Sequence, residues 1–440
     1  MDVLGVGGVQ SVPGFFLDNV TVGSQGEDIS LNHVAVLVLN VADPRNPSTP
    51  LPGILGMNLF GDRDLIINAD VNGSDTTFLA FGPAITPKWT FNGNGTWGDD
   101  TKWSLGTPDG PDLKANFTDA ITGAATVTVD SSGFTVGQIS FDNANRYTIA
   151  GPGTITLEAF TTGTSAISVV SGSHTISAPV TLHSNTTITV TPANGTLTMS
   201  GDLNGGSVML TKDGVGALEM KHVRAGTFNV SAGTVMIAAN GTNTGASRVT
   251  ALTIAGGATP TAKLNLTNNA MAIDYTGTSP ASSVRDLLQA GFANGAWTGN
   301  GITSSHAAAI AADSSNTHKT AIGFAEASAI GNPTTWFGQS VDGTSLLMRY
   351  TFSGDANLDG HVNSGDFTSL SQNFNGSGRF WWHGDFNFDG IVNALDFNMI
   401  ATNFGQVMTS EALGALVPEP SFACLALSTC LLLRRRPRAQ

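Results

Sequence analysis

Two short stretches near the C-terminus repeat one spacing of oxygen-bearing side chains. The stretch 354–367 matches the stretch 384–397 at an offset of 30 residues. In each copy, Asp or Asn stands at positions 1, 3, 5, 9 and 12 of a twelve-residue loop, and glycine stands at position 6. Calcium prefers six to eight oxygen ligands, and alternate residues of a tight loop can direct their oxygens to one point. The sequence therefore predicts two calcium loops.

The two predicted loops use equivalent residues. Position 7 donates a main-chain carbonyl, so the side chains of His361 and Ile391 are irrelevant to the metal. Gly360 and Gly390 permit the sharp turn at position 6. The predicted ligands of the two calcium ions are Asp355, Asn357, Asp359, His361, Asn363 and Asp366 in the first loop, and Asp385, Asn387, Asp389, Ile391, Asn393 and Asp396 in the second.

The same apolar pattern follows each predicted loop. Phe367 and Phe374 follow the first loop, and Phe397 and Phe404 occupy the equivalent positions after the second. This spacing predicts one short helix after each loop. Because each loop gathers three aspartates that repel one another without metal, we expect this unit to be folded with calcium and loose without it.

Paired calcium loops, each with an exiting helix and no entering helix, resemble a dockerin. The resemblance covers 354–405 and implies a small all-α calcium-binding module, which we place at 351–406. It also implies a cohesin-like or other surface-protein partner. In cellulosomal dockerins, loop positions 10 and 11 select the partner. Here these positions are Ser-Gly at 364–365 and Ala-Leu at 394–395, which differ from the common Ser-Thr pair and from each other.

Charge and cysteine distribution exclude several functional classes. The 440 residues carry 33 acids and 19 bases, a net charge of −14, and four of the bases lie within the last seven residues. A nucleic-acid-binding protein needs a basic face, which the rest of the chain lacks. Both cysteines, Cys424 and Cys430, stand in a C-terminal apolar stretch. Zinc ribbons, iron–sulfur clusters and cysteine proteases are therefore excluded.

Short strands separated by turn residues dominate 84–275. From Ile155 to Val235, eight steps over 80 residues give a mean spacing of ten between central apolar residues. Thr and Ser fill the polar positions, and such uncharged side chains can stack without repulsion. The pattern favours a mainly β fold with a β-helix-like solenoid, and a β-sandwich is the alternative. The segment 210–235 resembles the autotransporter-associated β-strand repeats of bacterial surface proteins.

The segment 276–350 predicts a mixed α/β region that closes the strand repeats. Apolar spacing predicts helices at 282–290 and 304–312, each begun by a serine cap, and Gly291 ends the first. The residues 340–350 are expected to form a closing hairpin that leads into the calcium module.

The segment 1–83 predicts a small β-rich unit, with buried strands at 34–39 and 65–68. Between them, the stretch 51–60 resembles the hydrophobic-hydrophobic-glycine turn near the end of a retropepsin-like aspartic protease domain. The matching residues are Ile54, Leu55 and Gly56. Such proteases need two aspartates in Asp-Thr-Gly or Asp-Ser-Gly turns, and the sequence contains neither. No catalytic residue is therefore predicted.

The C-terminal tail, 407–440, combines a Pro-Glu-Pro motif, a mostly apolar run at 422–433 and an arginine cluster. Twelve residues are fewer than the roughly 20 that span a bilayer comfortably. The order resembles a PEP-CTERM sorting signal of a bacterial, planctomycete-like surface protein, which implies an exosortase-type processing enzyme and a transient membrane anchor. The signal residues are Pro418, Glu419, Pro420, Arg434, Arg435 and Arg436.

These features together favour an exported cell-surface protein. No secretory signal precedes the first strands, so we expect the gene start to lie upstream or the chain to be a fragment. The first functional hypothesis is a structural or adhesion-type protein with a calcium-dependent interaction module, and no enzyme. The alternative is a component of extracellular polysaccharide binding or degradation. Trp89, Trp97 and Trp103 could provide a sugar-binding platform for it.

Overall fold

The computed structural model of this chain describes residues 86–160 and 163–408 in full. Within residues 2–84 it describes only the main chain of strands that pair antiparallel in sequence order, β1 with β2, β3 with β4, β5 with β6 and β7 with β8. Their bounds are β1 Asp2–Gly5, β2 Gly8–Ser11, β3 Gly14–Val22, β4 Ile29–Leu37, β5 Ala42–Asp43, β6 Asn46–Pro50, β7 Arg63–Asn68 and β8 Phe78–Ala84.

The strands expected in the N-terminal segment are found in part. Residues 34–37 lie in β4, and residues 65–68 lie in β7. The protease-like stretch 51–60, with Ile54, Leu55 and Gly56, lies outside the described residues.

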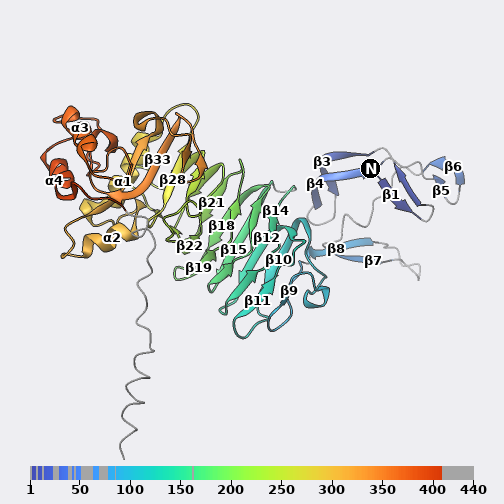
Figure 1. The fold of residues 1–440 in the computed structure, drawn as a ribbon. Helices are drawn as coiled ribbons and strands as arrows, with labels where there is room; N and C mark the ends of the chain where they lie inside the picture. Colours follow the sequence, from blue (N-terminus) through green and yellow to red (C-terminus); the bar gives the residue numbers. More distant parts are fainter. Residues whose placement is uncertain are drawn as a thin grey trace, which may run out of the picture.

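The central region is a β-solenoid of about 7 turns, which confirms the solenoid over the sandwich. Two long sheets run along it, and every strand pair within them is parallel (Figure 1). The first sheet contains, in spatial order, β20 Leu203–Asn204, β17 Val180–Leu182, β14 Ile155–Leu157, β12 Phe134–Asp142, β15 Thr164–Ser171, β18 Asn185–Val190, β21 Leu210–Asp213, β23 Thr227–Val230 and β26 Ala251–Ile254, with β10 Gly110–Phe117 beside β12. The second contains β29 Gly301–Thr303, β27 Lys263–Asn265, β24 Thr234–Ile237, β22 Ala217–Met220, β19 Thr196–Met199, β16 His174–Ile176, β13 Tyr147–Ala150, β11 Ala125–Thr128 and β9 Gly95–Thr96.

Like side chains stack from one solenoid turn to the next. Ile139 of β12 pairs with Ile167 of β15, which pairs with Ile188 of β18, and all three are buried. Between them, the outward Ser168 pairs with Thr189. Alternation of buried and partly exposed residues along each short strand therefore produces an apolar interior and a surface of uncharged hydroxyl groups.

Lys212 interrupts this apolar interior. It pairs with Ile188 and is fully buried. Its ammonium group donates hydrogen bonds to the carbonyls of Asp213 (2.8 Å), Gly214 (2.7 Å) and Ala232 (3.2 Å). Burial lowers the pKa of Lys212 to about 8. Three carbonyl oxygens thus replace water around the charge, a device that the sequence pattern did not reveal.

The three tryptophans at the start of the solenoid are structural. Trp89, Trp97 and Trp103 are all buried, and each ring packs against Phe117 with centroids 5.4 to 6.3 Å apart. A short 3-10 turn, η2 (Asp100–Lys102), holds this end closed. The expected sugar-binding platform is therefore wrong, because these indoles present no face to solvent.

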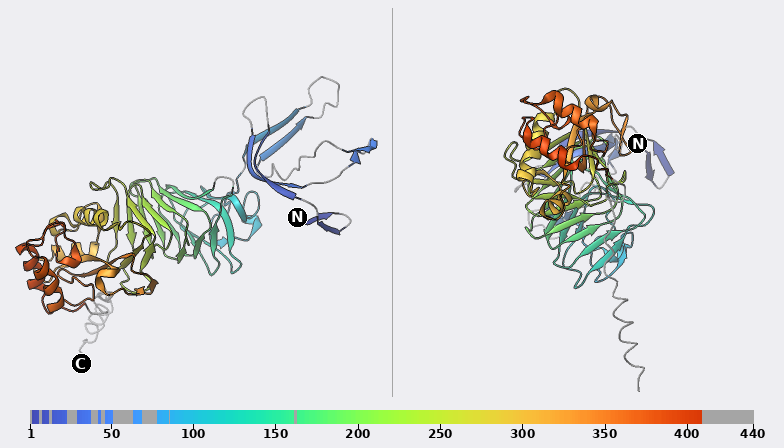
Figure 2. Two further views of the ribbon diagram at one scale, coloured as in Figure 1. Left: turned by 90° about the horizontal axis from the view of Figure 1, so that it is seen from above. Right: turned by 60° about the vertical axis from the view of Figure 1, so that its left-hand side comes forward.

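A mixed α/β cap closes the C-terminal end of the solenoid. A four-stranded sheet in the order β25, β28, β33, β30 lies beside α1, which packs on β29 (Figure 2). The cap elements are β25 Ser247–Val249, β28 Ala270–Asp274, α1 Ala281–Phe292, η3 Ala293–Gly295, α2 Ser305–Ala312, β30 Thr320–Glu326, η4 Ala327–Ile330, β31 Thr335–Trp336, β32 Gln339–Ser340 and β33 Ser345–Phe352.

Both expected helices are present, with two differences in detail. Ser304 caps α2 as expected, since its hydroxyl accepts the Ala307 amide at 3.0 Å. Ser282, in contrast, lies inside α1, which begins after Pro280. The expected hairpin at 340–350 is wrong, because β33 is one long strand that pairs antiparallel with β28 and β30 on either side. Its apolar run is buried on both faces of the sheet.

Within the described ranges, no helix has the length and apolar character needed to cross a membrane.

The stacked core predicts that shortening a buried side chain destabilises the solenoid more than shortening its partly exposed neighbour. Replacing Ile188→Ala should destabilise the solenoid by about 2–5 kcal/mol, because the methyl groups lost leave a cavity between two turns. Replacing the neighbouring, partly exposed Thr187→Ala should cost well under half of that. Urea unfolding followed by circular dichroism measures both, and equal losses would contradict the assigned register.

Candidate metal centre

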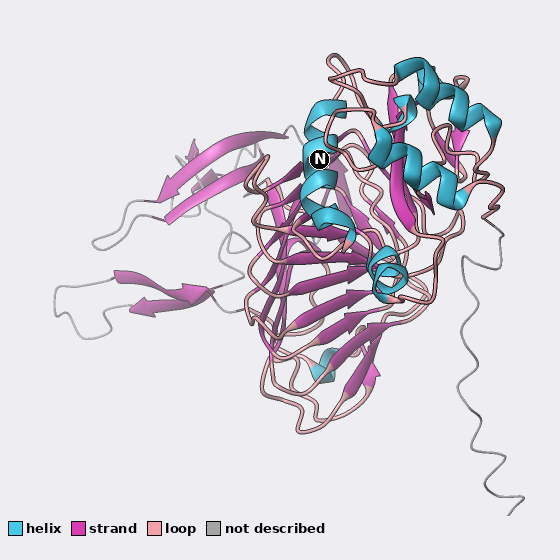
Figure 3. Ribbon diagram, turned by 90° about the vertical axis from the view of Figure 1, so that its left-hand side faces the viewer, coloured by secondary structure: helices cyan, strands magenta, loops and turns pink. Residues whose placement is uncertain are grey.

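Two helices and a 3-10 turn form the C-terminal end of the described chain, on the cap (Figure 3). They are α3 Ser364–Asn373, η5 Trp381–His383 and α4 Ala394–Asn403. Asn363 and Asn393 begin α3 and α4 through capping boxes, in which the aspartate three residues on accepts the amide of the asparagine. Loop positions 9 and 12 therefore start the helices as well as being candidate ligands.

The first loop wraps around two buried carboxylates. Asp355, at position 1, accepts the amides of Asp359 (3.1 Å) and Gly360 (2.9 Å). Asp366, at position 12, accepts three main-chain amides of the loop at 2.8, 2.9 and 3.2 Å. Gly360 adopts φ of 86°, which a residue with a Cβ rarely does. The two ends of the loop are thereby brought to one place.

The second loop repeats this arrangement. Asp385 accepts the Gly390 amide at 2.9 Å, and Asp396 accepts two main-chain amides at 2.8 and 2.9 Å. Asn387 donates to the Asp389 carboxylate at 2.9 Å, as the equivalent pair does in the first loop. The internal repeat in the sequence is thus a repeat of hydrogen-bonding geometry.

The remaining predicted ligands lie toward the outer side of each loop. Asn357 and Asp359 are exposed and joined by a 2.9 Å hydrogen bond. The side chains of His361 and Ile391, at position 7, are exposed as well.

Without a bound cation, keeping the buried carboxylates of Asp355 and Asp385 ionised costs free energy. Burial raises the pKa of Asp355 to about 7, against the opposing effects of the Thr351 hydroxyl and Arg349. Burial also raises the pKa of Asp385 to about 7, and the neighbouring Asp396 and Asp389 carboxylates raise it further. A bound cation would hold these groups ionised at neutral pH.

Among the described residues, one buried carboxylate oxygen lacks a hydrogen-bond partner. Asp385 Oδ1 is out of contact with solvent and accepts no hydrogen bond. Among the described residues, no three His, Cys, Asp or Glu side chains stand close enough to hold a metal ion by themselves. A cation at either loop therefore needs amide and main-chain oxygens in addition to carboxylates. This mixed set of oxygen donors fits calcium and does not fit softer metals.

The module is joined to the cap by contacts that the sequence did not reveal. Trp381 donates its indole N–H to the carbonyl of Asp355 at 2.6 Å. Arg349 of β33 donates to the Leu358 carbonyl inside the first loop at 2.9 Å. An arginine within the apolar run 345–352 is the one sequence signal for this contact. The cap therefore holds the first calcium loop directly.

Aromatic packing joins the second loop to the cap. The Phe388 ring, at position 4, lies 5.4 Å from the ring of Phe292, the last residue of α1, and 6.0 Å from the ring of Trp297, which follows η3. Phe324 of β30 stacks 6.2 Å from Phe388 and contacts Trp382 at 5.5 Å. The apolar core of the module is thus continuous with that of the cap.

The opposite side of the module presents aromatic groups to solvent. Phe367 of α3 and Phe397 of α4 are each more than two-fifths exposed, and their rings lie 6.3 Å apart. Leu395, at loop position 11, is 59% exposed beside them. We call Phe367, Leu395 and Phe397 the α3–α4 face. The charged residues of these two helices, Asp366 and Asp396, are buried, so the face is uncharged.

Comparison with known families supports this module. Residues 353–405 match the Dockerin type I domain family. Comparisons with curated proteins and with solved structures find no match to this chain. The C-terminal end of the described chain is accordingly a dockerin-type, calcium-dependent protein-interaction module. The tail residues Pro418, Glu419, Pro420, Arg434, Arg435 and Arg436 lie outside the described residues.

Calcium should stabilise the C-terminal end of the full chain. At a hundred times the dissociation constant, each site adds about 2.7 kcal/mol to the folded state. The pair Asp355→Asn and Asp385→Asn should abolish this gain while leaving the calcium-free protein no less stable, because neutral amides remove buried charge. Differential scanning calorimetry with calcium or a chelator measures the effect. Glu219→Gln in β22 is the control, and a calcium response that survives the paired substitution would contradict the assigned loops.

Calcium removal should also loosen the cap. Because Arg349 and Phe388 tie the loops to β33 and α1, hydrogen exchange in α1, β30 and β33 should rise when a chelator is added. Exchange in β15, β18 and β21, in the middle of the solenoid, should stay unchanged. Mass spectrometry of peptides from both regions checks this. Unchanged protection in the cap, with faster exchange in α3 and α4, would show that the module opens alone.

Proposed function

We propose that this chain is an exported cell-surface protein in which a β-solenoid stalk displays a calcium-dependent interaction module. The observation that carries the proposal is the pair of equivalent loops around buried aspartates within the dockerin-type segment. The stacked parallel strands of the stalk suit an extended spacer. Within the described residues, the buried tryptophans of the stalk leave no aromatic platform to favour the polysaccharide alternative at that position.

In this proposal the module holds two calcium ions, one in each loop. The first ion takes oxygens from Asp355, Asn357, Asp359, Asn363 and Asp366 and the carbonyl of His361, and the second takes the equivalent set ending at Asp396. Both loops contact the cap, through Arg349 and Phe292, so we expect loss of either ion to weaken the whole unit.

The α3–α4 face is the proposed site for a cohesin-like partner. It lies on the helices that leave the calcium loops, and Leu395 belongs to the loop itself. Ordering of the loops by calcium therefore positions the face. Because the face is aromatic and uncharged, an apolar partner surface complements it better than a charged one.

Export and sorting are part of the same proposal. The tail contains Pro418-Glu419-Pro420, then an apolar run, then a cluster of arginines. This order supports processing by an exosortase-type enzyme at the cell envelope. Removal of the apolar tail at that step would release the module to the outer side. The calcium available outside cells is compatible with loops of this kind.

Partner binding should require both calcium and the α3–α4 face. We expect recombinant cohesin modules to bind the full chain in calcium and to lose binding in a chelator. Phe397→Ser should weaken binding at least tenfold, because the ring is central to the face. The control is Val215→Ser, an exposed apolar residue of the solenoid that lies outside the module, at 63% exposure against 43% for Phe397.

Titration calorimetry gives each affinity. Binding that is indifferent to calcium, or that is weakened equally by Val215→Ser, would contradict the proposed face. If no cohesin module binds the chain, a cohesin-like partner is excluded.

A further inference from the structure

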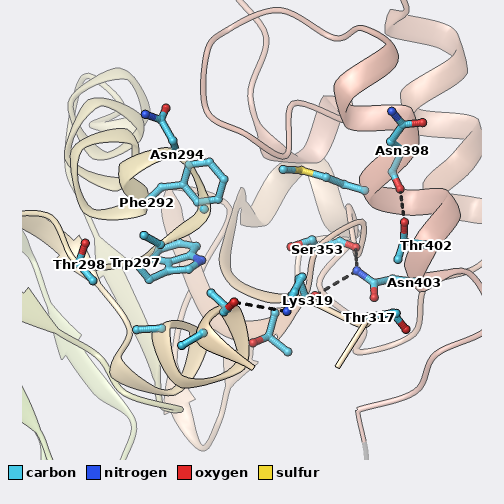
Figure 4. A pocket seen from close by; sticks show the side chains of 17 residues that line it. Phe292, Asn294, Trp297, Thr298, Thr317, Lys319, Ser353, Asn398, Thr402 and Asn403 are labelled. Atoms are coloured by element: carbon cyan, nitrogen blue, oxygen red, sulfur yellow. Dashed lines mark hydrogen bonds between the residues drawn. The ribbon is translucent and has the colours of Figure 1, made fainter. Parts of the chain in front are cut away.

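A cavity of about 700 Å³ lies at the junction of the cap and the module, and its lining includes no predicted calcium ligand and no residue of the α3–α4 face (Figure 4). One wall comes from the end of α1 and from η3, a second from α2, and a third from α4. Its volume is in the range of pockets that hold small organic molecules. Nothing in the proposed interaction function uses it.

The lining of the cavity is mainly apolar and has an uncharged polar rim. The inner part is formed by Phe292, Trp297, Ala308, Ala311 and Met399. The rim is formed by the exposed amides and hydroxyls of Asn294, Thr298, Asn398 and Thr402. Among the described residues that line the cavity there is no carboxylate. A cationic ligand would therefore find no counter-charge there.

The one cation in the lining is already engaged. Lys319 donates hydrogen bonds from its ammonium group to the carbonyls of Ile310 (2.9 Å), Ala311 (3.4 Å) and Asp313 (2.8 Å) at the C-terminal end of α2. This position complements the negative end of the helix. An anionic ligand would have to compete with these bonds, so the lining favours an uncharged one.

The walls of the cavity are held in place by specific contacts. The buried Asn403 side chain donates to the carbonyls of Lys319 (3.0 Å) and Ser353 (2.7 Å), which fixes the end of α4 on the cap. A hydrogen bond of 3.0 Å joins the His318 ring to the Thr402 carbonyl. On the other wall, the Thr303 hydroxyl donates to the Trp297 carbonyl at 2.6 Å. The cavity is therefore a preformed feature.

The aromatic wall carries unusual backbone conformations. Ala293, Asn294 and Trp297 all have positive φ, at 46°, 57° and 55°. Residues other than glycine adopt this conformation at a cost, and such residues cluster where a structure is shaped for a ligand. The strained turn here places the Trp297 and Phe292 rings at right angles, 5.4 Å apart, against the cavity.

We propose that the cavity between η3, α2 and α4 is a binding site for an uncharged, mainly apolar small molecule. The aromatic and alanine surfaces take its apolar body, and the rim amides and hydroxyls contact any polar group that it carries. Because two walls belong to the cap and one to the module, the bound molecule would contact both parts of the chain.

The probe for this proposal is N-phenyl-1-naphthylamine, an uncharged molecule that fluoresces in apolar surroundings. Its matched control is 8-anilino-1-naphthalenesulfonate, which has the same rings and adds a sulfonate. With the full chain in saturating calcium, we expect saturable binding of one uncharged probe and at least tenfold weaker binding of the sulfonate. Equal binding of both probes, or no binding of the first, would overturn the proposal.

Filling the cavity should abolish probe binding. Ala311→Trp places an indole inside it from α2, whereas Ala309→Trp places the same indole on the exposed side of that helix. Met399→Trp fills the cavity from α4 and serves if Ala311→Trp lowers the melting temperature. We expect loss of binding in the filled variants and retention in Ala309→Trp.

Binding that persists in both filled variants but disappears in Phe397→Ser would place the probe on the α3–α4 face and contradict the site. Calcium binding and partner binding are measured separately, so absence of probe binding in the cavity would not contradict the proposed interaction function.

Discussion

The structure of the C-terminal module depends on the burial of four aspartate carboxylates. Asp355, Asp366, Asp385 and Asp396 are all fully buried, and burial raises the pKa of each. Main-chain amides satisfy part of their hydrogen-bonding capacity, Arg349 and Arg285 offset the effect of burial only in part, and one oxygen of Asp385 has no partner. A divalent cation in each loop, as proposed, would offset this cost. The fold of the loops, the start of α3 and α4, and the position of the α3–α4 face all follow from that requirement.

The junction with the cap extends this requirement beyond the module. Arg349 contacts the first loop, and Phe388 places the second loop against the end of α1. A repeat array needs its last turn covered, because an open end exposes apolar interior and unpaired strands. In this chain the cover is made by the cap, and the cap shares its core with the module. We therefore expect the stability of this end of the solenoid to depend on calcium binding by the loops.

The sequence predicted what depends on local repetition. The ten-residue spacing of apolar residues predicted the solenoid. The repeat at 354–397 predicted two equivalent loops, each followed by a helix. It could not predict contacts between distant segments. From the sequence alone Lys212 would be placed on the surface, because the carbonyls that accept its hydrogen bonds are brought together only by the folded solenoid. The hydrogen bond from Trp381 to the Asp355 carbonyl likewise depends on where β33 leads the chain. The burial of Trp97 likewise depends on Phe117, twenty residues later. Such pairings are set by the fold as a whole.

The most direct test of the account is the number of calcium ions bound by the full chain. Titration calorimetry should give two ions per chain for the parent protein. Asp385→Asn should leave one, because it removes one of the two buried carboxylates of the second loop and leaves the first loop unchanged. Two ions bound by that variant, or none bound by the parent, would contradict the assignment of the paired loops as the metal centre.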